Sequence, residues 1–166
     1  MSTAEAAFQV LEALERTQVE YIVVGGMAGV LLGAPIVTAD VDIVHRRSVE
    51  NVARLMAVLK ELGAYVRSDL AGRRLIPDEG HLTGRGHINL MTRVGPLDVL
   101  CEVGDSLGYD ELIQDTEGVV VGNLQLRVLS LPKLIEVKTA AGRPKDRWAI
   151  PILVATHQKR LKGPVG

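Results

Sequence analysis

The order of apolar and polar positions along the chain predicts helices and strands in turn. Apolar side chains recur at helical spacing over Thr3–Arg16. Tyr21–Val24 is a short apolar run that ends at two glycines, which is typical of a buried strand entering a turn. Met27–Leu32 is small and apolar and favours a short helix, and Ala39–Val44 alternates carboxylate and aliphatic residues as a strand does. The chain is therefore predicted to begin as helix, strand, short helix and strand.

The middle of the chain combines one clear helix with a segment that lacks apolar periodicity. A serine cap and inward-facing aliphatic residues predict a helix over Ser48–Leu62. Arg67–Gly86 is rich in glycine and arginine and is predicted to be a hairpin or a mobile loop. Two strands are predicted after it, around His87–Thr92 and Leu97–Glu102, joined by a glycine-proline turn.

The last third of the chain is predicted to be a hairpin between helices. Ser106–Gln114 favours a helix. Two short strands are predicted around a Gly-Asn turn, over Val119–Val121 and Leu124–Val128. A serine cap with proline in the first turn predicts a helix over Ser130–Ala141, and a last helix is expected over Lys145–Leu161, which Pro151 can kink. Helices and strands mix without strict alternation, so the predicted class is α+β (α/β-like) with a mixed sheet.

Composition narrows the class of protein without identifying it. The chain of 166 residues fits a single domain over residues 1–166, long enough for a sizeable core. A net charge of -1 argues against a protein that coats polyanions. Cys101 is the single cysteine, which excludes an internal disulfide and fits a reducing compartment. Because no apolar stretch is long enough for a bilayer and the N-terminus does not read as a signal peptide, a cytoplasmic protein without membrane contact is expected.

Three segments carry candidate chemistry. Gly25 and Gly26 directly follow a predicted strand, Asp40 and Asp42 lie on the next strand, and Asp98 lies on a later one. Alternate strand residues share a face, so the first two aspartates lie side by side and repel each other. Hard divalent cations such as Mg²⁺ prefer oxygen ligands and resolve that repulsion. A third carboxylate on a neighbouring strand would complete a two-metal site.

Each of these residues also has a plainer interpretation. Asp40 and Asp42 are alternatively solubility residues of an edge strand, although their aliphatic neighbours favour a buried strand. Asp98 is alternatively a turn residue or an ion-pair partner, and Glu102 competes with it as the third carboxylate. A lone glycine pair is a weak signal, because many turns use it. Together with the paired aspartates it becomes a strong one.

Two stretches resemble a known superfamily. The segment GGMAGVLLGAPIVTADVDIV resembles the signature of the DNA polymerase beta-type nucleotidyltransferases, in which two small residues precede an Asp-apolar-Asp-apolar strand. The tail LIEVKTAAGRPKDRWAIPIL is similar to the last motif of the minimal nucleotidyltransferases and of the abortive-infection (AbiEii-like) toxin nucleotidyltransferases. That motif has a lysine in one helix and Arg-x-Lys-Asp at the start of the next.

The resemblance implies a fold, a reaction and a set of roles. The fold is a mixed sheet with helices on one side and a C-terminal helical pair. The reaction transfers a nucleoside monophosphate from a triphosphate such as ATP to a hydroxyl group, with Mg²⁺ or Mn²⁺ as cofactor. The two glycines match the phosphate-binding turn and the three aspartates match the metal ligands. The basic tail positions, of which one or two are expected to meet the triphosphate, are Lys138, Arg143 and Lys145.

The acceptor does not follow from the sequence. Protein, RNA and small molecules all stay open, as does a role within a toxin–antitoxin system, and a partner protein or homodimer is a possible source of further surface. The alternative is a nucleotide-binding or toxin–antitoxin partner module without catalysis. The intact glycine pair and three aspartates favour the enzyme.

Overall fold

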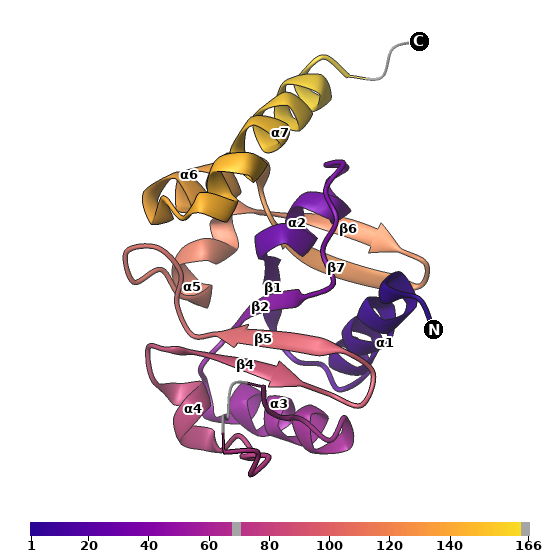
Figure 1. The fold of residues 1–166 in the computed structure, drawn as a ribbon, viewed down its shortest axis with the longest axis vertical. Coiled ribbons are helices and arrows are strands. Elements are labelled where there is room, and N and C mark those ends of the chain that lie inside the picture. The colour runs from indigo at the N-terminus through magenta and orange to yellow at the C-terminus, as the bar shows by residue number, and fades with distance from the viewer. Residues whose placement is uncertain (68–70, 164–166) are drawn as a thin grey trace.

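The computed structural model describes residues 1–67 and 71–163. In that part of the chain one mixed sheet has the strand order β3-β4-β5-β2-β1-β7-β6 (Figure 1). The β2–β5 and β1–β7 pairs are parallel and the other neighbours antiparallel. The strands are β1 Tyr21–Val24, β2 Val41–His45, β3 Tyr65–Val66, β4 His87–Met91, β5 Pro96–Leu100, β6 Thr116–Val121 and β7 Leu124–Leu129.

The helices begin and end largely where the sequence predicts. Side chains of Ser2, Ser48 and Ser130 accept hydrogen bonds at the starts of α1, α3 and α6, and Gly142, with φ of 61°, ends α6. None of the described helices has the length and apolar character of a membrane span. The helices are α1 Thr3–Arg16, α2 Gly25–Leu31, α3 Val49–Glu61, α4 Glu79–Thr83, α5 Tyr109–Leu112, α6 Leu131–Ala141 and α7 Pro144–Leu161.

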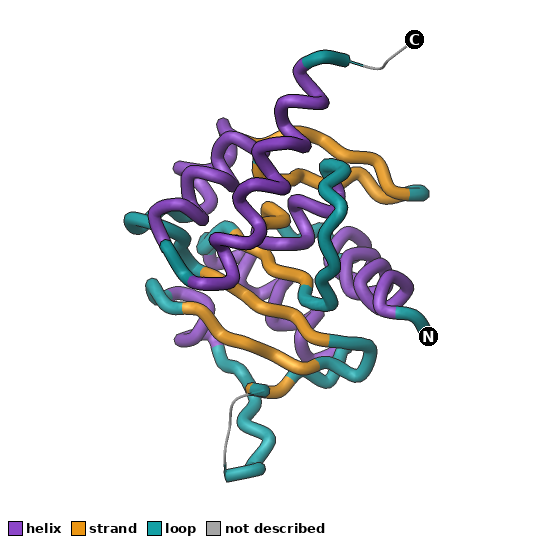
Figure 2. The backbone as a smooth tube through the Cα atoms, turned by 45° about the horizontal axis from the view of Figure 1, so that its top comes forward, coloured by secondary structure: helices purple, strands orange, loops and turns teal. Residues whose placement is uncertain are grey.

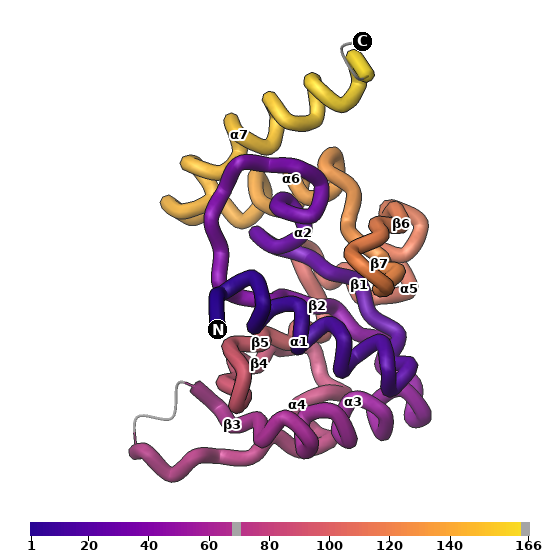
Figure 3. Tube along the Cα trace, turned by 90° about the vertical axis from the view of Figure 1, so that its right-hand side faces the viewer, coloured from indigo at the N-terminus to yellow at the C-terminus, as the bar shows by residue number. Residues whose placement is uncertain are grey.

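The pleat of the central strands separates the core from the polar face. Val41 and Ile43 of β2 and Leu97 and Val99 of β5 are fully buried in one apolar cluster. The intervening residues of both strands point to the opposite face. Figure 3 shows α1, α3 and α4 grouped on one side of these strands and α2, α6 and α7 on the other. The predicted α+β class with a mixed sheet and a C-terminal helical pair is confirmed. The implied placement of the helices on one side of the sheet is wrong, because helices cover both faces.

The prediction for Arg67–Gly86 is wrong in part. Residues 68–70 lie outside the described residues, and residues 71–78 form a connection without regular structure that stands out from the body (Figure 2). The segment then forms α4, whose side chain Leu82 is fully buried. Asp78 caps this helix by accepting a hydrogen bond from the backbone N–H of His81. A helix of one turn rests on its cap and a single buried side chain, so periodicity does not reveal it.

The predicted helix over Ser106–Gln114 is shorter in the structure. It consists of α5 and one 3₁₀ turn over Ile113–Asp115. Ser106 has a positive φ of 60°, which belongs to a turn and not to a helix. The start of β2 also differs from the prediction, because Asp40 lies one residue before the strand.

Candidate active site

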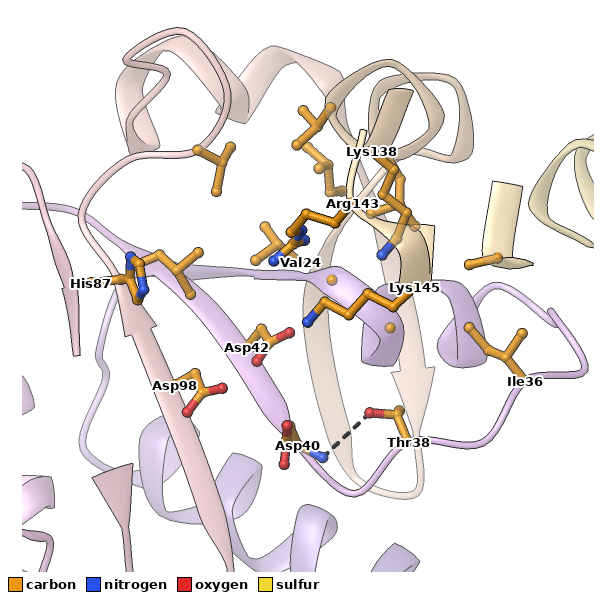
Figure 4. Close-up of a pocket in the computed structure, with 18 of the residues that line it drawn as sticks. Val24, Ile36, Thr38, Asp40, Asp42, His87, Asp98, Lys138, Arg143 and Lys145 are labelled. Carbon is orange, nitrogen blue, oxygen red and sulfur yellow. Dashed lines mark hydrogen bonds between the residues drawn. The ribbon is translucent and has the colours of Figure 1, made fainter. Parts of the chain in front are cut away.

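A cavity of about 470 Å³ opens on the polar face of the sheet. Its wall is built from the first turn of α2, the connection into β2, the strands β4 and β5, helix α6 and the first turn of α7 (Figure 4). Tertiary structure therefore brings together segments from both ends of the chain. The lining residues include every predicted site residue, namely Gly25, Gly26, Asp40, Asp42, Asp98, Lys138, Arg143 and Lys145.

The carboxylates gather on one side of this cavity. Asp42 and Asp98 are direct neighbours in the parallel register of β2 and β5. The backbone N–H of Asp40 donates to Thr38 Oγ1 at 3.3 Å, which holds its side chain next to the start of β2 (Figure 4). Glu102 lies elsewhere, because it pairs with Arg47 at 3.3 Å. Of the two candidates for the third carboxylate, Asp98 is the one beside Asp42.

Burial and mutual repulsion favour protonation of these carboxyls. Burial, a contact with Asp98 and the charge of Asp40 raise the pKa of Asp42 to about 7, against the opposing charge of Lys145. Burial also raises the pKa of Asp98, although the Arg67 guanidinium opposes this shift. Folding therefore gathers carboxyl groups in positions that disfavour their charged form, which is typical of functional sites.

The carboxylates fit a divalent cation that shares its ligands with a substrate. Among residues 1–67 and 71–163, no three or more acidic, histidine or cysteine side chains form a ready-made metal cage. Magnesium sites of phosphate-transferring enzymes need none, because they use one or two carboxylates together with waters and substrate phosphates. Neighbouring Asp42 and Asp98 meet that requirement, since a cation would stabilise the charged form of two carboxyls whose pKa values burial raises.

Gly25 is required by the close approach of Asp42. Its φ is +66°, and a Cβ atom at this position would lie 2.1 Å from Asp42 Oδ2. Gly26 is less restricted, since a Cβ there would lie 3.3 Å from the Cβ of Thr38. The first glycine thus leaves room for a carboxylate, a reason that sequence spacing alone does not reveal.

We predict that Gly25→Ala displaces Asp42 and removes metal binding at this site. Gly63→Ala is the matched control, because Gly63 has φ of +61° and nothing within 4 Å of the added Cβ. Both variants are expected to lose about 1 kcal/mol of stability from backbone strain. Only Gly25→Ala should also lose Mn²⁺ binding, measured by calorimetric titration. Equal Mn²⁺ affinity in the two variants would contradict this role of Gly25.

The three basic tail residues have different surroundings. Lys138 and Arg143 both pair with the fully buried Asp146, at 3.4 and 2.8 Å. Burial works to raise the pKa of Asp146, but the hydrogen bonds and charges of Arg143 and Lys138 hold it below its ordinary value. Lys145 has no carboxylate partner among the described residues, and its amine points toward Asp42 (Figure 4). Lys145 is thus the most available of the three cations.

Three further residues with polar side chains line the cavity and were not predicted as site residues, namely Arg67, His87 and Asn89. Arg67 Nη2 donates to Asp98 Oδ1 at 2.9 Å, and Asn89 stands opposite Asp98 in the β4–β5 register. His87 lies on the same face of β4, two residues before Asn89. The polar–apolar alternation of β4 is a signal that could have indicated His87 and Asn89. For Arg67 there is no local signal, because only the fold brings β3 and β5 to the same cavity.

Comparisons with known proteins relate this fold to nucleotidyltransferases. The aminoglycoside-2''-adenylyltransferase family profile matches residues 6–82, which include the glycine pair and the first two aspartates. The structure of the lincosamide antibiotic adenylyltransferase LnuA, with lincomycin bound, aligns with a TM-score of 0.63 and 13% identity, over 92% of this chain and 96% of that one. No curated protein matches the sequence.

Two further solved structures share this fold over most of their length. The antibiotic-resistance factor ANT(2'')-Ia aligns with a TM-score of 0.61 and 18% identity, over 94% of this chain and 85% of that one. A candidate nucleotidyltransferase from Thermotoga maritima aligns with a TM-score of 0.58 and 16% identity, over 97% and 93%. At such identities the alignments establish the fold. The chain therefore has the fold of these nucleotidyltransferases, with Gly25, Gly26, Asp40 and Asp42 on one cavity.

Proposed function

We propose that this protein transfers a nucleoside monophosphate, with ATP as the donor, to a hydroxyl group of a small molecule in a reaction that depends on Mg²⁺ or Mn²⁺. The observation that carries the proposal is the pairing of Asp42 with Asp98 in one register, with Lys145 facing them across the cavity. Carboxylates on one wall and an ammonium group on the other suit a metal-bound triphosphate.

Each residue has a defined task in this reaction. Asp40, Asp42 and Asp98 would hold the divalent cations, which when bound polarise the α-phosphate and offset the charge of the leaving pyrophosphate. Lys145 binds the triphosphate, while Gly25 and Gly26 at the start of α2 let the phosphates approach the backbone. The acceptor oxygen forms the new bond to the α-phosphorus as the bond to pyrophosphate breaks.

The proton of the attacking hydroxyl needs a base within the cavity. Asp98 has a carboxylate in the cavity wall, beside Asp42, and takes that proton in our proposal. Lys138 and Arg143 act indirectly, because their pairing with Asp146 fixes the corner between α6 and α7 from which Lys145 projects.

The named relatives favour a small-molecule acceptor over a toxin–antitoxin role. The structure of LnuA, a lincosamide antibiotic adenylyltransferase, contains lincomycin. A structure of ANT(2'')-Ia contains adenylyl-2''-tobramycin, an adenylylated antibiotic. A partner protein is not needed for such an acceptor. A cytoplasmic location, where ATP and Mg²⁺ are available, fits this proposal.

The cavity walls favour an acceptor with few positive charges. Apart from the three aspartates, the described lining residues include no carboxylate that could pair with ammonium groups. One wall is aliphatic, with Leu100, Val103, Leu134 and Val137. A polyamine sugar would leave most of its charges unpaired against such a wall, at a high desolvation cost. A hydroxylated compound with an apolar face is therefore the better match.

We predict that ATP binding requires Mg²⁺ or Mn²⁺, because the triphosphate would otherwise meet three carboxylates. Calorimetric titration with ATP should show binding with either cation and none with a chelator. Pyrophosphate release, followed with lincomycin, tobramycin and uncharged hydroxylated antibiotics in turn, then identifies the acceptor class. The Asp98→Asn variant is the control, and it should release no pyrophosphate with any acceptor. ATP binding of equal strength without metal would refute the metal-dependent reaction.

A further inference from the structure

Arg67 occupies the position between two of the three carboxylates. Its Nη2 donates to Asp98 Oδ1 at 2.9 Å and its Nη1 lies 3.7 Å from Asp40 Oδ1. The side chain of Asp98 is 14% exposed, whereas those of Arg67 and Asp40 are 32% and 45% exposed, so water reaches this contact from the cavity side. Arg67 thus connects two carboxylates in the wall of the candidate site.

We propose that Arg67 competes with divalent cations for Asp98 and Asp40, and that the displaced guanidinium binds the triphosphate that arrives with the metal. The inference rests on the proposed function and adds a phosphate-binding residue to it. Asp98 Oδ1 already accepts a charged hydrogen bond from Arg67. A dication bound at the same oxygen would stand beside a guanidinium of like charge, and the repulsion favours one of the two.

The backbone of Arg67 keeps the displaced side chain close to the cavity. Its N–H donates to the carbonyl oxygen of Asn89 at 2.9 Å, which continues the β3–β4 pairing by one residue. Asn89 in turn stands opposite Asp98. Rotation of the side chain can therefore break the contact with Asp98 while the Cα atom stays at the sheet edge.

Phosphate is the chemical partner that this position suits. Guanidinium groups bind phosphate oxygens with two parallel hydrogen bonds, and a triphosphate supplies negative charge as the metal takes the carboxylates. Arg67 lines the cavity from the β3 side and Lys145 from the start of α7. Two cations on different walls would hold a triphosphate between them.

Arg67→Gln tests the competition without any measurement of activity. Arg47→Gln is the matched control: the Arg47 side chain is 30% exposed against 32% for Arg67, and it pairs with Glu102 outside the lining residues. Titration with Mn²⁺ alone should give about tenfold tighter binding to the Arg67→Gln protein than to the natural sequence. Arg47→Gln should bind Mn²⁺ as the natural sequence does.

A second titration tests the role in phosphate binding. With Mn²⁺ saturating, ATP affinity should fall about tenfold in Arg67→Gln and less in Arg67→Lys, which keeps the charge but not the paired donors. Melting curves confirm that each variant is folded. Unchanged or weaker Mn²⁺ binding by folded Arg67→Gln would overturn the competition, and unchanged ATP affinity would overturn the phosphate contact. Failure of both proteins to bind Mn²⁺ alone would overturn the competition, whereas ATP binding that does not need Mn²⁺ would overturn the proposed function, so the two failures are distinguishable.

Discussion

Replacing Asp42 with asparagine is expected to abolish nucleotidyl transfer and, at the same time, to stabilise the metal-free protein. The amide keeps the shape of the side chain and removes a charge that burial, Asp98 and Asp40 all disfavour. Loss of a metal ligand should lower the transfer rate on the order of 1,000-fold. Loss of the repulsion should raise stability by about 1 kcal/mol, or roughly 2–4 °C in melting temperature.

The pH dependence of stability provides a second measurement of the same effect. The pKa of Asp42 is about 7 in the folded protein, whereas an unfolded aspartate has a pKa of about 3.9. The folded state therefore binds more protons between these values, and stability decreases as the pH rises from about 4 to about 7. Asp42→Asn should remove this part of the slope, measured by thermal unfolding with a chelator present. A clear fall in melting temperature with metal-dependent ATP binding intact would assign Asp42 a structural role instead.

Replacing Asp146 with asparagine is expected to have the opposite effect on stability. This carboxylate is fully buried and accepts from both the backbone N–H and the Nε of Arg143, while Lys138 lies 3.4 Å away. The amide would leave Lys138, only 12% exposed, without its counter-charge. We expect a loss of about 3 kcal/mol in the free energy of unfolding, at the lower end for a broken buried pair because Arg143 can turn to water.

Urea unfolding measures this loss, with a surface ion pair as the comparison. Glu117→Gln removes a partner of Arg160, and both of these side chains are about two-fifths exposed. The Glu117 variant should lose less than about 1 kcal/mol. Asp146→Asn should also weaken ATP binding, since the corner that presents Lys145 loosens. Equal stability losses in the two variants would show that the Asp146 cluster does not hold α6 and α7 together.

An element was predictable from the sequence when the interactions that form it lie within its own segment. The boundaries of α1, α3 and α6 were predictable because caps and apolar spacing lie within the segment itself. The β6–β7 hairpin was predictable because its Gly-Asn turn is local. Helix α4 was missed, since its stability comes from Leu82 packing beneath the sheet and from one cap.

For the candidate site, the sequence by itself determined which residues carry charge and which strand face Asp42 occupies, because alternation along one strand is a local property. Only the tertiary structure decided that Asp98 and not Glu102 stands beside Asp42, since that depends on the register between β2 and β5. It also decided that Asp146 binds Lys138 and that Arg67 meets Asp98, contacts between segments that no spacing relates. The charge of a side chain depends on the residue type, whereas the group that it contacts depends on how the whole chain packs.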